Sequence, residues 1–397
     1  MRILITTDWY TPAVNGVVSS VLALMKGLEE RGHEVKILTL SQQNRSYTEG
    51  NVLYQAAHNC SFVYQKARFS LRMDKSILRR ILDWKPDVIH SQCEFSTFRM
   101  ARKISERCGA PIIHTFHTDY EHYTRYCFIP DFLGKGFSRF IYRYAAKRSS
   151  ALVVPSSKTA RLVAGYGISK MCFVVPSGVD LQRFSSFNDP DRIAELCRQH
   201  NLDDGSFRLL FVGRVAKEKN IDELLSFMAA LSDLDIKLII AGDGPYMPDV
   251  KELSEKLGLG DKVVFAGMIP PENIQEYYHL SDAFVIASTS ETQGLCLVEA
   301  LASSLPVICR HDPVVDGVIA NGFNGFQYSD HDEFRAAVSY MLADRNRFNE
   351  LKDNARKTAE RYSVPSFAET AEDIYRISLW AEEKASSHCP MRWEITR

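Results

Sequence analysis

The stretch AFVIASTSETQGLCLVEALA, residues 283–302, decides how this chain folds. It opens with a short apolar run over 283–287, continues through a polar loop that contains Gly294, and ends in apolar residues at helical spacing. A buried strand followed by a loop and a helix is the repeating unit of a parallel sheet covered by helices. Residues 283–302 therefore predict one unit of an α/β fold.

The same alternation of strands and helices extends through most of the chain. One series starts with the strand-like run Arg2–Thr6, and a second starts with Phe207–Val212 and ends in helical patterns over 330–362 and 364–384. The stretch 181–205 between the two series is polar and charged. We predict an α/β protein with two doubly wound, Rossmann-like domains and an interdomain cleft.

The two halves of the chain differ in charge. The 397 residues carry a net charge of −1, but residues 1–185 hold 26 Lys and Arg against 14 Asp and Glu, which leaves 22 against 35 for the remainder. We predict a basic amino-terminal domain over 1–185, a second domain over 186–375, and a carboxyl-terminal helix and tail over 376–397 that packs back on the first domain. A basic domain favours an anionic partner, either nucleic acid or an acidic membrane surface.

Composition excludes several classes of protein. With 45% hydrophobic and 24% charged residues, the chain has the composition of a soluble globular protein. No apolar run approaches the length of a membrane span, and the amino terminus lacks the features of a secretory signal. The nine cysteines show no Cys-x-x-Cys spacing, which argues against a disulfide framework and a zinc knuckle. We therefore expect reduced thiols in a cytoplasmic protein.

Ligands of open α/β sheets bind beyond the carboxyl ends of the strands, so the loops that follow the strands hold the candidate site residues. The first such loop ends at Gly16 and leads into a helix, where a glycine lets the backbone approach a phosphate. A turn glycine without a ligand is an equally good interpretation of Gly16 alone. The loop at His114-Thr-Phe-His117 favours a polar contact to a sugar over a metal site, since no matching Cys/His set accompanies it.

Two loops of the second domain carry complementary charges. Arg214, Lys217 and Lys219 follow a strand-end glycine, and fixed cations there suit a leaving diphosphate. In the loop after residue 287, Glu291 and Glu299 offer oxygens to sugar and ribose hydroxyls, while the backbone N–H groups around Gly294, Leu295 and Cys296 suit phosphate. We expect Glu299 in the first turn of the following helix, where complementing the helix dipole is the alternative role for it.

These motifs together resemble the family 4 retaining glycosyltransferases, which have the GT-B fold. The resemblance runs from end to end and rests on several motifs in order: the loop ending at Gly16, His117, Pro176-Ser-Gly-Val-Asp180 with Phe184, Gly213-Arg214 with Lys219, Ala241-Gly-Asp-Gly-Pro245, and Glu291 with Glu299. One departure is the order Val-Asn-Gly-Val around Gly16, in place of the paired glycines common in the family.

The resemblance implies a donor site and a mechanism. Arg214 and Lys219 would neutralise the diphosphate of a nucleotide sugar, Glu291 would contact the sugar and Glu299 the ribose. Gly16 would offer a backbone contact to phosphate, and His117 would lie beside the donor sugar. Transfer would retain the anomeric configuration and would need neither a protein nucleophile, nor a metal, nor a cofactor.

For the acceptor, two stretches of the first domain mix cations with aromatic residues at helical spacing, 64–84 and 123–148. Such helices suit an anionic bilayer, although an ordinary amphipathic helix with its aromatic residues in the core explains either stretch alone. Within the family, the first loop and the stretch His114–Tyr120 are most similar to bacterial diacylglycerol α-glucosyltransferases. The expected reaction is glucosyl transfer from UDP-glucose to diacylglycerol, at the inner face of the cell membrane.

Three alternatives stay open at this point. The same fold can act on a soluble or polysaccharide acceptor, and a nucleotide-sugar epimerase or a binding protein can use a similar two-domain scaffold. Nucleic-acid binding is disfavoured because the acidic second half would repel phosphate chains.

Overall fold

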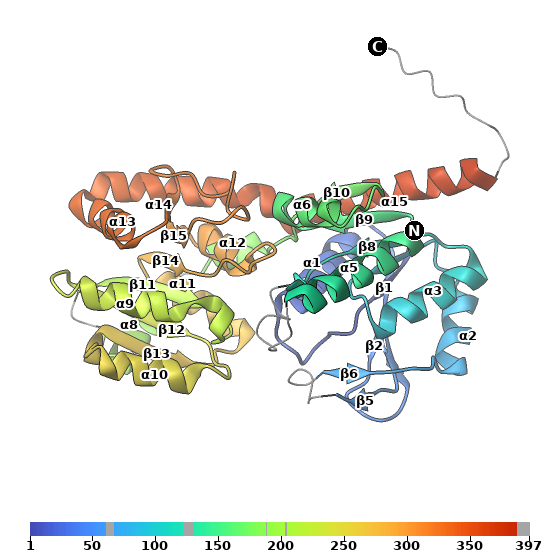
Figure 1. Cartoon of the computed structure of the whole chain (residues 1–397), viewed down its shortest axis with the longest axis horizontal. Helices are drawn as coiled ribbons and strands as arrows, with labels where there is room; N and C mark the ends of the chain where they lie inside the picture. The colour runs from blue at the N-terminus through green and yellow to red at the C-terminus, as the bar shows by residue number, and fades with distance from the viewer. Residues whose placement is uncertain (61–66, 122–130, 188, 203–204, 387–397) are drawn as a thin grey trace, which may run out of the picture. The chain divides into compact units, whose positions relative to one another are not determined.

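The computed structural model describes residues 1–60, 67–121, 131–187, 189–202 and 205–386, with the side chains of 131, 132, 385 and 386 left out. This part of the chain forms two compact units, and Figure 1 labels most of their helices and strands. The first unit contains residues 1–118, 135–178 and 364–386, and the second contains 179–363 with 119–121 and 131–134.

The first unit is built on an eight-stranded sheet of order β10-β9-β8-β7-β1-β2-β4-β3, in which only β3 and β4 pair antiparallel. The strands are β1 (Arg2–Thr6), β2 (Glu34–Leu40), β3 (Tyr47–Glu49), β4 (Val52–Gln55), β7 (Val88–Ser91), β8 (Ile112–Thr115), β9 (Ala151–Val154) and β10 (Cys172–Val174), with a separate pair β5 (His58–Asn59) and β6 (Arg68–Phe69). Its helices are α1 (Gly16–Glu30), α2 (Lys75–Trp84), α3 (Ser96–Cys108), α5 (Asp131–Arg148), α6 (Ser157–Gly165) and α15 (Val364–Ser386).

The second unit has a six-stranded, fully parallel sheet of order β13-β12-β11-β14-β15-β16. The strands are β11 (Phe207–Val212), β12 (Ile236–Ala241), β13 (Val263–Gly267), β14 (Ala283–Ile286), β15 (Val307–Arg310) and β16 (Gly325–Tyr328). The helices are α7 (Leu181–Ser185), α8 (Pro190–Gln199), α9 (Ile221–Ala230), α10 (Met247–Lys256), α11 (Ile274–Leu280), α12 (Leu295–Ala302), α13 (His331–Ala343) and α14 (Arg345–Ala359), with short 3-10 turns η1 (Lys217–Lys219), η2 (Gly260–Lys262), η3 (Pro271–Asn273) and η4 (Glu360–Tyr362).

Both faces of this second sheet are covered by helices. Along β11, Leu210 belongs to one buried apolar cluster, while its neighbours Leu209 and Phe211 belong to the cluster on the opposite face. Successive side chains of a strand point to opposite faces, so a strand buried on both sides is apolar throughout. The predicted α/β class with two doubly wound domains is confirmed.

In each unit the strand order reverses at one position. The chain runs outward from β1 to β2 and β4, then resumes on the other side with β7; in the second unit it runs from β11 to β13 and resumes with β14. Ligands of doubly wound sheets bind at this switch point, beyond the carboxyl ends of the two central strands. The loops after β1 and β7, and after β11 and β14, are therefore the expected ligand-binding positions.

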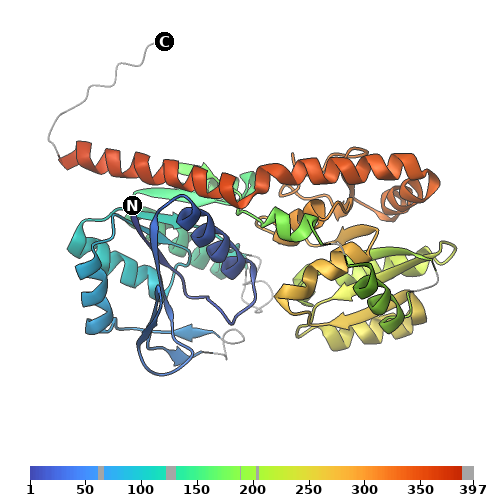
Figure 2. The same ribbon diagram turned by 180° about the vertical axis from the view of Figure 1, so that it is seen from behind.

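Helix α15 returns the end of the chain to the first unit, where it packs along α1 (Figure 2). The contact is close, because a Cβ added at Gly27 would lie 2.6 Å from Cβ of Ala368. The hydroxyl of Tyr375 on α15 also lies 2.6 Å from Nδ1 of the buried His90. The predicted second domain ran to residue 375, whereas the second unit ends at 363 and all of α15 belongs to the first.

The other boundary also differs from the predicted one. The boundary between the units falls after Gly178, where the chain passes from the first unit to the second, rather than after residue 185. Val179 donates its backbone N–H to the carbonyl of Tyr362 at 2.8 Å, so the two crossings of the chain lie side by side. The polar composition of 181–205 placed the boundary a few residues late, since α7 already belongs to the second unit.

Candidate functional site

The switch point of the second unit brings a predicted cation and a predicted carboxylate into contact. Lys219, at the end of η1, places Nζ 2.6 Å from Oε1 of Glu291, which lies on the loop after β14. Both side chains are largely buried, with 22% and 15% of their surface exposed. Partial burial strengthens such a pair because little water screens it. These two residues are 72 positions apart in the chain and meet because β11 and β14 are neighbours.

Arg214 and Glu218 form a second ion pair in the same loop. The Arg214 side chain is 32% exposed, and Lys217, which the resemblance left out of the site, is exposed at the surface. The hydroxyls of Ser288 and Ser290 both donate to the carbonyl of Glu218 at 3.3 Å, which ties the loop after β14 to the loop after β11. Cations already held by carboxylates are preorganised for an anionic ligand.

Gly213 and Gly242 allow the loops after β11 and β12 to run in close contact. A Cβ at Gly242 would lie 1.8 Å from the carbonyl oxygen of Gly213, and one at Gly244 would lie 2.3 Å from that of Val215. The N–H of Val215 in turn donates to the carbonyl of Asp243 at 3.0 Å. The motif Ala241–Pro245 thus supports the backbone that carries Arg214.

Glu299 lies in the second turn of α12, so the expected place in the first turn is wrong. Gly294, with a left-handed φ of 75°, occupies the position before the helix, which begins at Leu295. Oε2 of Glu299 accepts a hydrogen bond from the hydroxyl of Tyr278 at 2.8 Å. Burial raises the pKa of Glu299, and the hydrogen bond from Tyr278 opposes that rise. The helix dipole is strongest within the first turn, which weakens the dipole role for Glu299.

Leu295 and Cys296 are the first two residues of α12, and Leu297 already donates its N–H to the carbonyl of Gly294 at 3.0 Å. Burial raises the pKa of the Cys296 thiol, and the nearby carboxylates of Glu291 and Glu299 raise it further. Both predicted glutamates therefore act electrostatically on the start of the same helix.

In the first unit, Gly16 is exposed and is the first residue of α1. Oδ1 of Asn15 accepts the N–H of Val18 at 3.0 Å, which caps the helix. Asparagine is among the best residues at that position. The departure from paired glycines at this loop thus gives α1 a side-chain cap.

His117 follows β8 and places Nε2 2.7 Å from Oε1 of Gln92, in the loop after β7. Because an amide oxygen only accepts, Nε2 carries the proton and Nδ1 is left as an acceptor. Burial, with a smaller contribution from the neighbouring His114, lowers the pKa of His117 to about 3. His117 is therefore a neutral hydrogen-bonding group at physiological pH.

His114 has no exposed surface and packs against the rings of Phe98 and Phe116, with centroids 5.0 and 4.6 Å away. A ring buried in this way is unsuited to a direct sugar contact, which the shared motif with His117 had favoured. In the described ranges, no group of three His, Cys, Asp or Glu residues is arranged to hold a metal ion.

Three further polar residues, which no sequence motif indicated, follow strands of the first unit: Asp8, Gln92 and Glu94. Asp8 follows β1 by two residues, and the other two follow β7 in the run Gln92-Cys-Glu94. Both runs directly follow central strands, and that position is the signal that would have identified them. They are the polar residues of the first unit's switch point.

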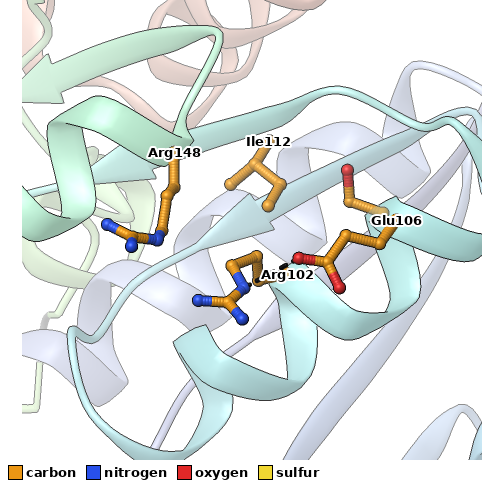
Figure 3. Close-up of a pocket in the computed structure, with 5 residues that line it drawn as sticks. Arg102, Glu106, Ile112 and Arg148 are labelled. Carbon is orange, nitrogen blue, oxygen red and sulfur yellow. Dashed lines mark ion pairs between the residues drawn. The ribbon is translucent and has the colours of Figure 1, made fainter.

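An open hollow lies elsewhere on the first unit, lined by Arg102, Ser105, Glu106, Ile112 and Arg148 (Figure 3). Nε of Arg102 lies 2.9 Å from Oε1 of Glu106, so this arginine is already neutralised. Ile112 is the first residue of β8, at the amino end of the strand. The hollow is therefore at the edge of the sheet opposite to the switch point.

Comparison with known families identifies the chain. The profile described as "Glycosyltransferase Family 4" matches residues 14–183, and "Glycosyl transferases group 1" matches 193–358. The alpha-monoglucosyldiacylglycerol synthase of Streptococcus pneumoniae is 33% identical over 347 residues, which is 86% of this chain and 79% of that protein. This chain belongs to glycosyltransferase family 4. It is a glycosyltransferase.

Two further similarities agree with this assignment. The alpha-monoglucosyldiacylglycerol synthase of Acholeplasma laidlawii is 28% identical over 94% of this chain and 96% of its own length. Among solved structures, Anabaena Alr3699/HepE in complex with UDP and glucose superimposes with a TM-score of 0.74 at 17% identity, covering 95% of this chain and all of that one. The latter likeness shows the fold, which is GT-B.

Proposed function

We propose that this glycosyltransferase moves glucose from UDP-glucose to the 3-hydroxyl of diacylglycerol, with retention of the anomeric configuration. The observation that carries the donor part is the contact between Lys219 and Glu291 at the switch point, beside Arg214. The choice of lipid acceptor is supported by the two relatives named as alpha-monoglucosyldiacylglycerol synthases.

The donor chemistry follows from charge. A departing nucleoside diphosphate develops negative charge, and Arg214 and Lys219 are fixed cations that suit it. When the diphosphate binds, it competes with the carboxylates of Glu218 and Glu291 for these cations. Glu291, once displaced from Lys219, is a hydrogen-bond acceptor for a sugar hydroxyl, and Glu299 serves the ribose. No protein nucleophile or metal is part of this proposal.

The membrane part of the proposal rests on α5. Phe137 and Phe140 are 48% and 66% exposed on this helix. Exposed cations lie on the same helix at Lys135, Arg139, Arg143, Lys147 and Arg148. A helix with apolar and cationic side chains on its open face suits the interface of an anionic bilayer. Part of the predicted stretch, 123–130, lies outside the described residues.

The other predicted membrane-binding stretch, 64–84, has a different burial pattern in its described residues. On α2, Ile77, Leu78 and Ile81 are buried in the first unit, while Arg79 and Arg80 are exposed. This is the pattern of an ordinary amphipathic helix, and residues 64–66 of the stretch lie outside the described residues.

Within the described ranges, no helix combines the length and apolar character needed to span a bilayer. We propose peripheral attachment through α5 to the inner face of a bacterial cell membrane.

The deciding experiment supplies the purified protein with UDP-glucose and diacylglycerol in liposomes of neutral or anionic composition. We expect an α-glucosyldiacylglycerol product, identified by NMR at the anomeric carbon, and a higher rate on anionic liposomes. A parallel screen of other nucleotide sugars tests the donor. A product with a soluble acceptor and none with lipid would reject the proposed acceptor, and an altered sugar still attached to UDP would indicate an epimerase.

Replacing Phe137 and Phe140 together by serine tests the membrane role of α5. We expect weaker sedimentation with anionic liposomes and a lower rate on them, because the apolar anchor is lost. Activity on a short-chain diacylglycerol in detergent is the control and should be retained. Unchanged liposome binding would contradict the role of α5.

A further inference from the structure

A pair of carboxyl groups lies at the switch point of the first unit. Oδ1 of Asp8, after β1, accepts the backbone N–H of Thr97 at 2.8 Å. Oδ2 of Asp8 is buried and makes no hydrogen bond within the described part of the chain. Glu94, after β7, is 7% exposed and acts electrostatically on Asp8. As a residue Asp8 is partly exposed, so its carboxyl group lies just beneath the surface of the unit.

Two further buried groups surround this pair. His114 is fully buried, with Nε2 3.5 Å from Oε1 of Glu94, and neither ring nitrogen makes a hydrogen bond to a described residue. Gln92 is 2% exposed, and while its Oε1 contacts His117, its Nε2 makes no hydrogen bond in the described part of the chain. Buried polar groups with unused hydrogen-bonding capacity thus gather at one point.

Buried polar groups without hydrogen-bond partners lower the stability of the folded protein. A buried donor or acceptor without a partner destabilises a fold by roughly 1–3 kcal/mol, and native proteins contain few of them. Asp8 and Gln92 lie where a doubly wound sheet binds its ligand, and His114, within the neighbouring strand β8, contacts Glu94. A ligand that completes the hydrogen bonds of Asp8 and Gln92 explains why these two polar groups remain unpaired within the described part of the protein.

The chemistry of the cluster indicates the kind of ligand. Burial and the negative charge of Glu94 both raise the pKa of Asp8. Gln92 adds an amide donor, and His117 is neutral. An anion would be repelled here, whereas an uncharged hydroxyl can donate to a carboxylate and accept from an amide N–H.

We propose that Asp8 binds the hydroxyl of the glycosyl acceptor, with Glu94, His114 and Gln92 holding that subsite in place. This inference rests on the proposed function, because it assigns the acceptor end of the same reaction. The hydroxyl donates its hydrogen bond to the ionised carboxylate of Asp8, which fixes the acceptor oxygen for attack.

The pH dependence of acceptor use distinguishes acceptor binding by Asp8 from a purely structural role, because a structural role would leave the pH profile unchanged. Burial, with a smaller contribution from Glu94, raises the pKa of Asp8 to about 6, although hydrogen bonds from Thr97 and from the N–H of Ser96 oppose the rise. The buried thiol of Cys93 also faces Asp8. Asp8 is ionised above about pH 6, so acceptor use should fall as the pH drops through that value.

The test compares Asp8→Asn with the wild type, using dioctanoylglycerol as acceptor between pH 5 and pH 8. The asparagine keeps an oxygen for the N–H of Thr97, so the fold is retained. We expect a loss of roughly 10–100-fold in kcat/KM for the acceptor, unchanged affinity for UDP, and no acid limb near pH 6. Glu94→Gln should give a smaller loss in the same parameter.

Asp87→Asn is the matched control, since Asp87 accepts the backbone N–H of Arg2 at 2.6 Å at the amino edge of the same sheet. It should leave acceptor use and the pH profile unchanged. Identical kinetics and pH profiles for Asp8→Asn and wild type would overturn the assignment, as would an equal loss of UDP affinity. If the wild type transfers to no lipid, the proposed function fails; the two proteins are then compared by donor hydrolysis, in which water is the acceptor hydroxyl.

Discussion

The two switch points share one topology and have opposite chemistry. In the second unit, the loops after the central strands hold the ion pairs Lys219–Glu291 and Arg214–Glu218. In the first unit, the equivalent loops hold Asp8 and Glu94, and the neutral His117 follows the next strand, β8. Sheet topology therefore fixes where a ligand binds, while the loop residues fix its charge, and the difference suits an anionic donor in one unit and an uncharged acceptor in the other.

Lys219→Ala should show the largest effect, because it removes a cation from the switch point of the second unit. Removing a fixed cation from the diphosphate should lower kcat by roughly 10²–10³-fold, the range seen when one electrostatic group at a transition state is lost. Steady-state kinetics with varied UDP-glucose checks it. Lys217→Ala is the control, because Lys217 lies on the same turn but is exposed. Equal losses from both variants would contradict the site.

Gly242→Ala tests how strongly the donor loop depends on its backbone support. A Cβ there would overlap the carbonyl oxygen of Gly213 at 1.8 Å, so the loop that carries Arg214 must move. We expect a fall in UDP affinity together with a lower melting temperature, since forced repacking costs about 1–3 kcal/mol. Calorimetric titration with UDP and thermal unfolding measure the two effects. Wild-type UDP affinity would show that the contact is dispensable.

Gly27→Ala tests how much the packing of α15 against α1 contributes to the stability of the protein. The added methyl would meet Cβ of Ala368 at 2.6 Å and push α15 away from α1, destabilising the protein by about 1–3 kcal/mol. Gly136→Ala is the control on α5, where an added Cβ meets no atom within 4 Å. That variant should be neutral or slightly stabilising, since alanine favours helix. Chemical unfolding of both variants decides the matter.

Asp8→Asn should show the smallest effect on folding, in the stabilising direction. The pKa of Asp8 is raised in the folded protein to about 6 from 3.8, so ionisation opposes folding. This penalty is absent below pH 3.8, grows as the pH rises toward 6, and persists at neutral pH. The variant should melt a few degrees higher than wild type at pH 7.5, and the gap should close at about pH 4. A lower melting temperature at pH 7.5 would contradict the cost assigned to Asp8.

Sequence patterns predicted the elements of the fold well where the pattern is local. The runs Arg2–Thr6 and Phe207–Val212 are strands with the predicted bounds, and the helical pattern beginning at Val364 is α15. The short strands β3 to β6 were not predicted, because two to four residues give too little periodicity to detect. The start of α12 was placed too late, because the helix begins at Leu295, directly after the left-handed Gly294, and this puts Glu299 in its second turn.

The candidate site likewise combines local features, which the sequence shows, with long-range contacts, which it does not show. That the loops after strands carry Arg214, Lys219 and Glu291 is visible in the chain itself, since each follows an apolar run. That Lys219 contacts Glu291 depends on β11 lying beside β14, which is a long-range pairing. Asp8 and Glu94 were overlooked for the same reason, because 86 residues separate them and each alone is an ordinary loop carboxylate.

By itself, the sequence determined the alternation of strands and helices, the two doubly wound domains and the chemistry available in each loop, because these depend on residues close together in the chain. Only the tertiary structure decided which loops meet, that all of α15 from Val364 belongs to the first unit with α1 as its partner, and that α5 exposes Phe137 and Phe140 while α2 buries its apolar side chains. Strand order and burial depend on contacts between distant residues, and periodicity within a short window carries no record of those contacts.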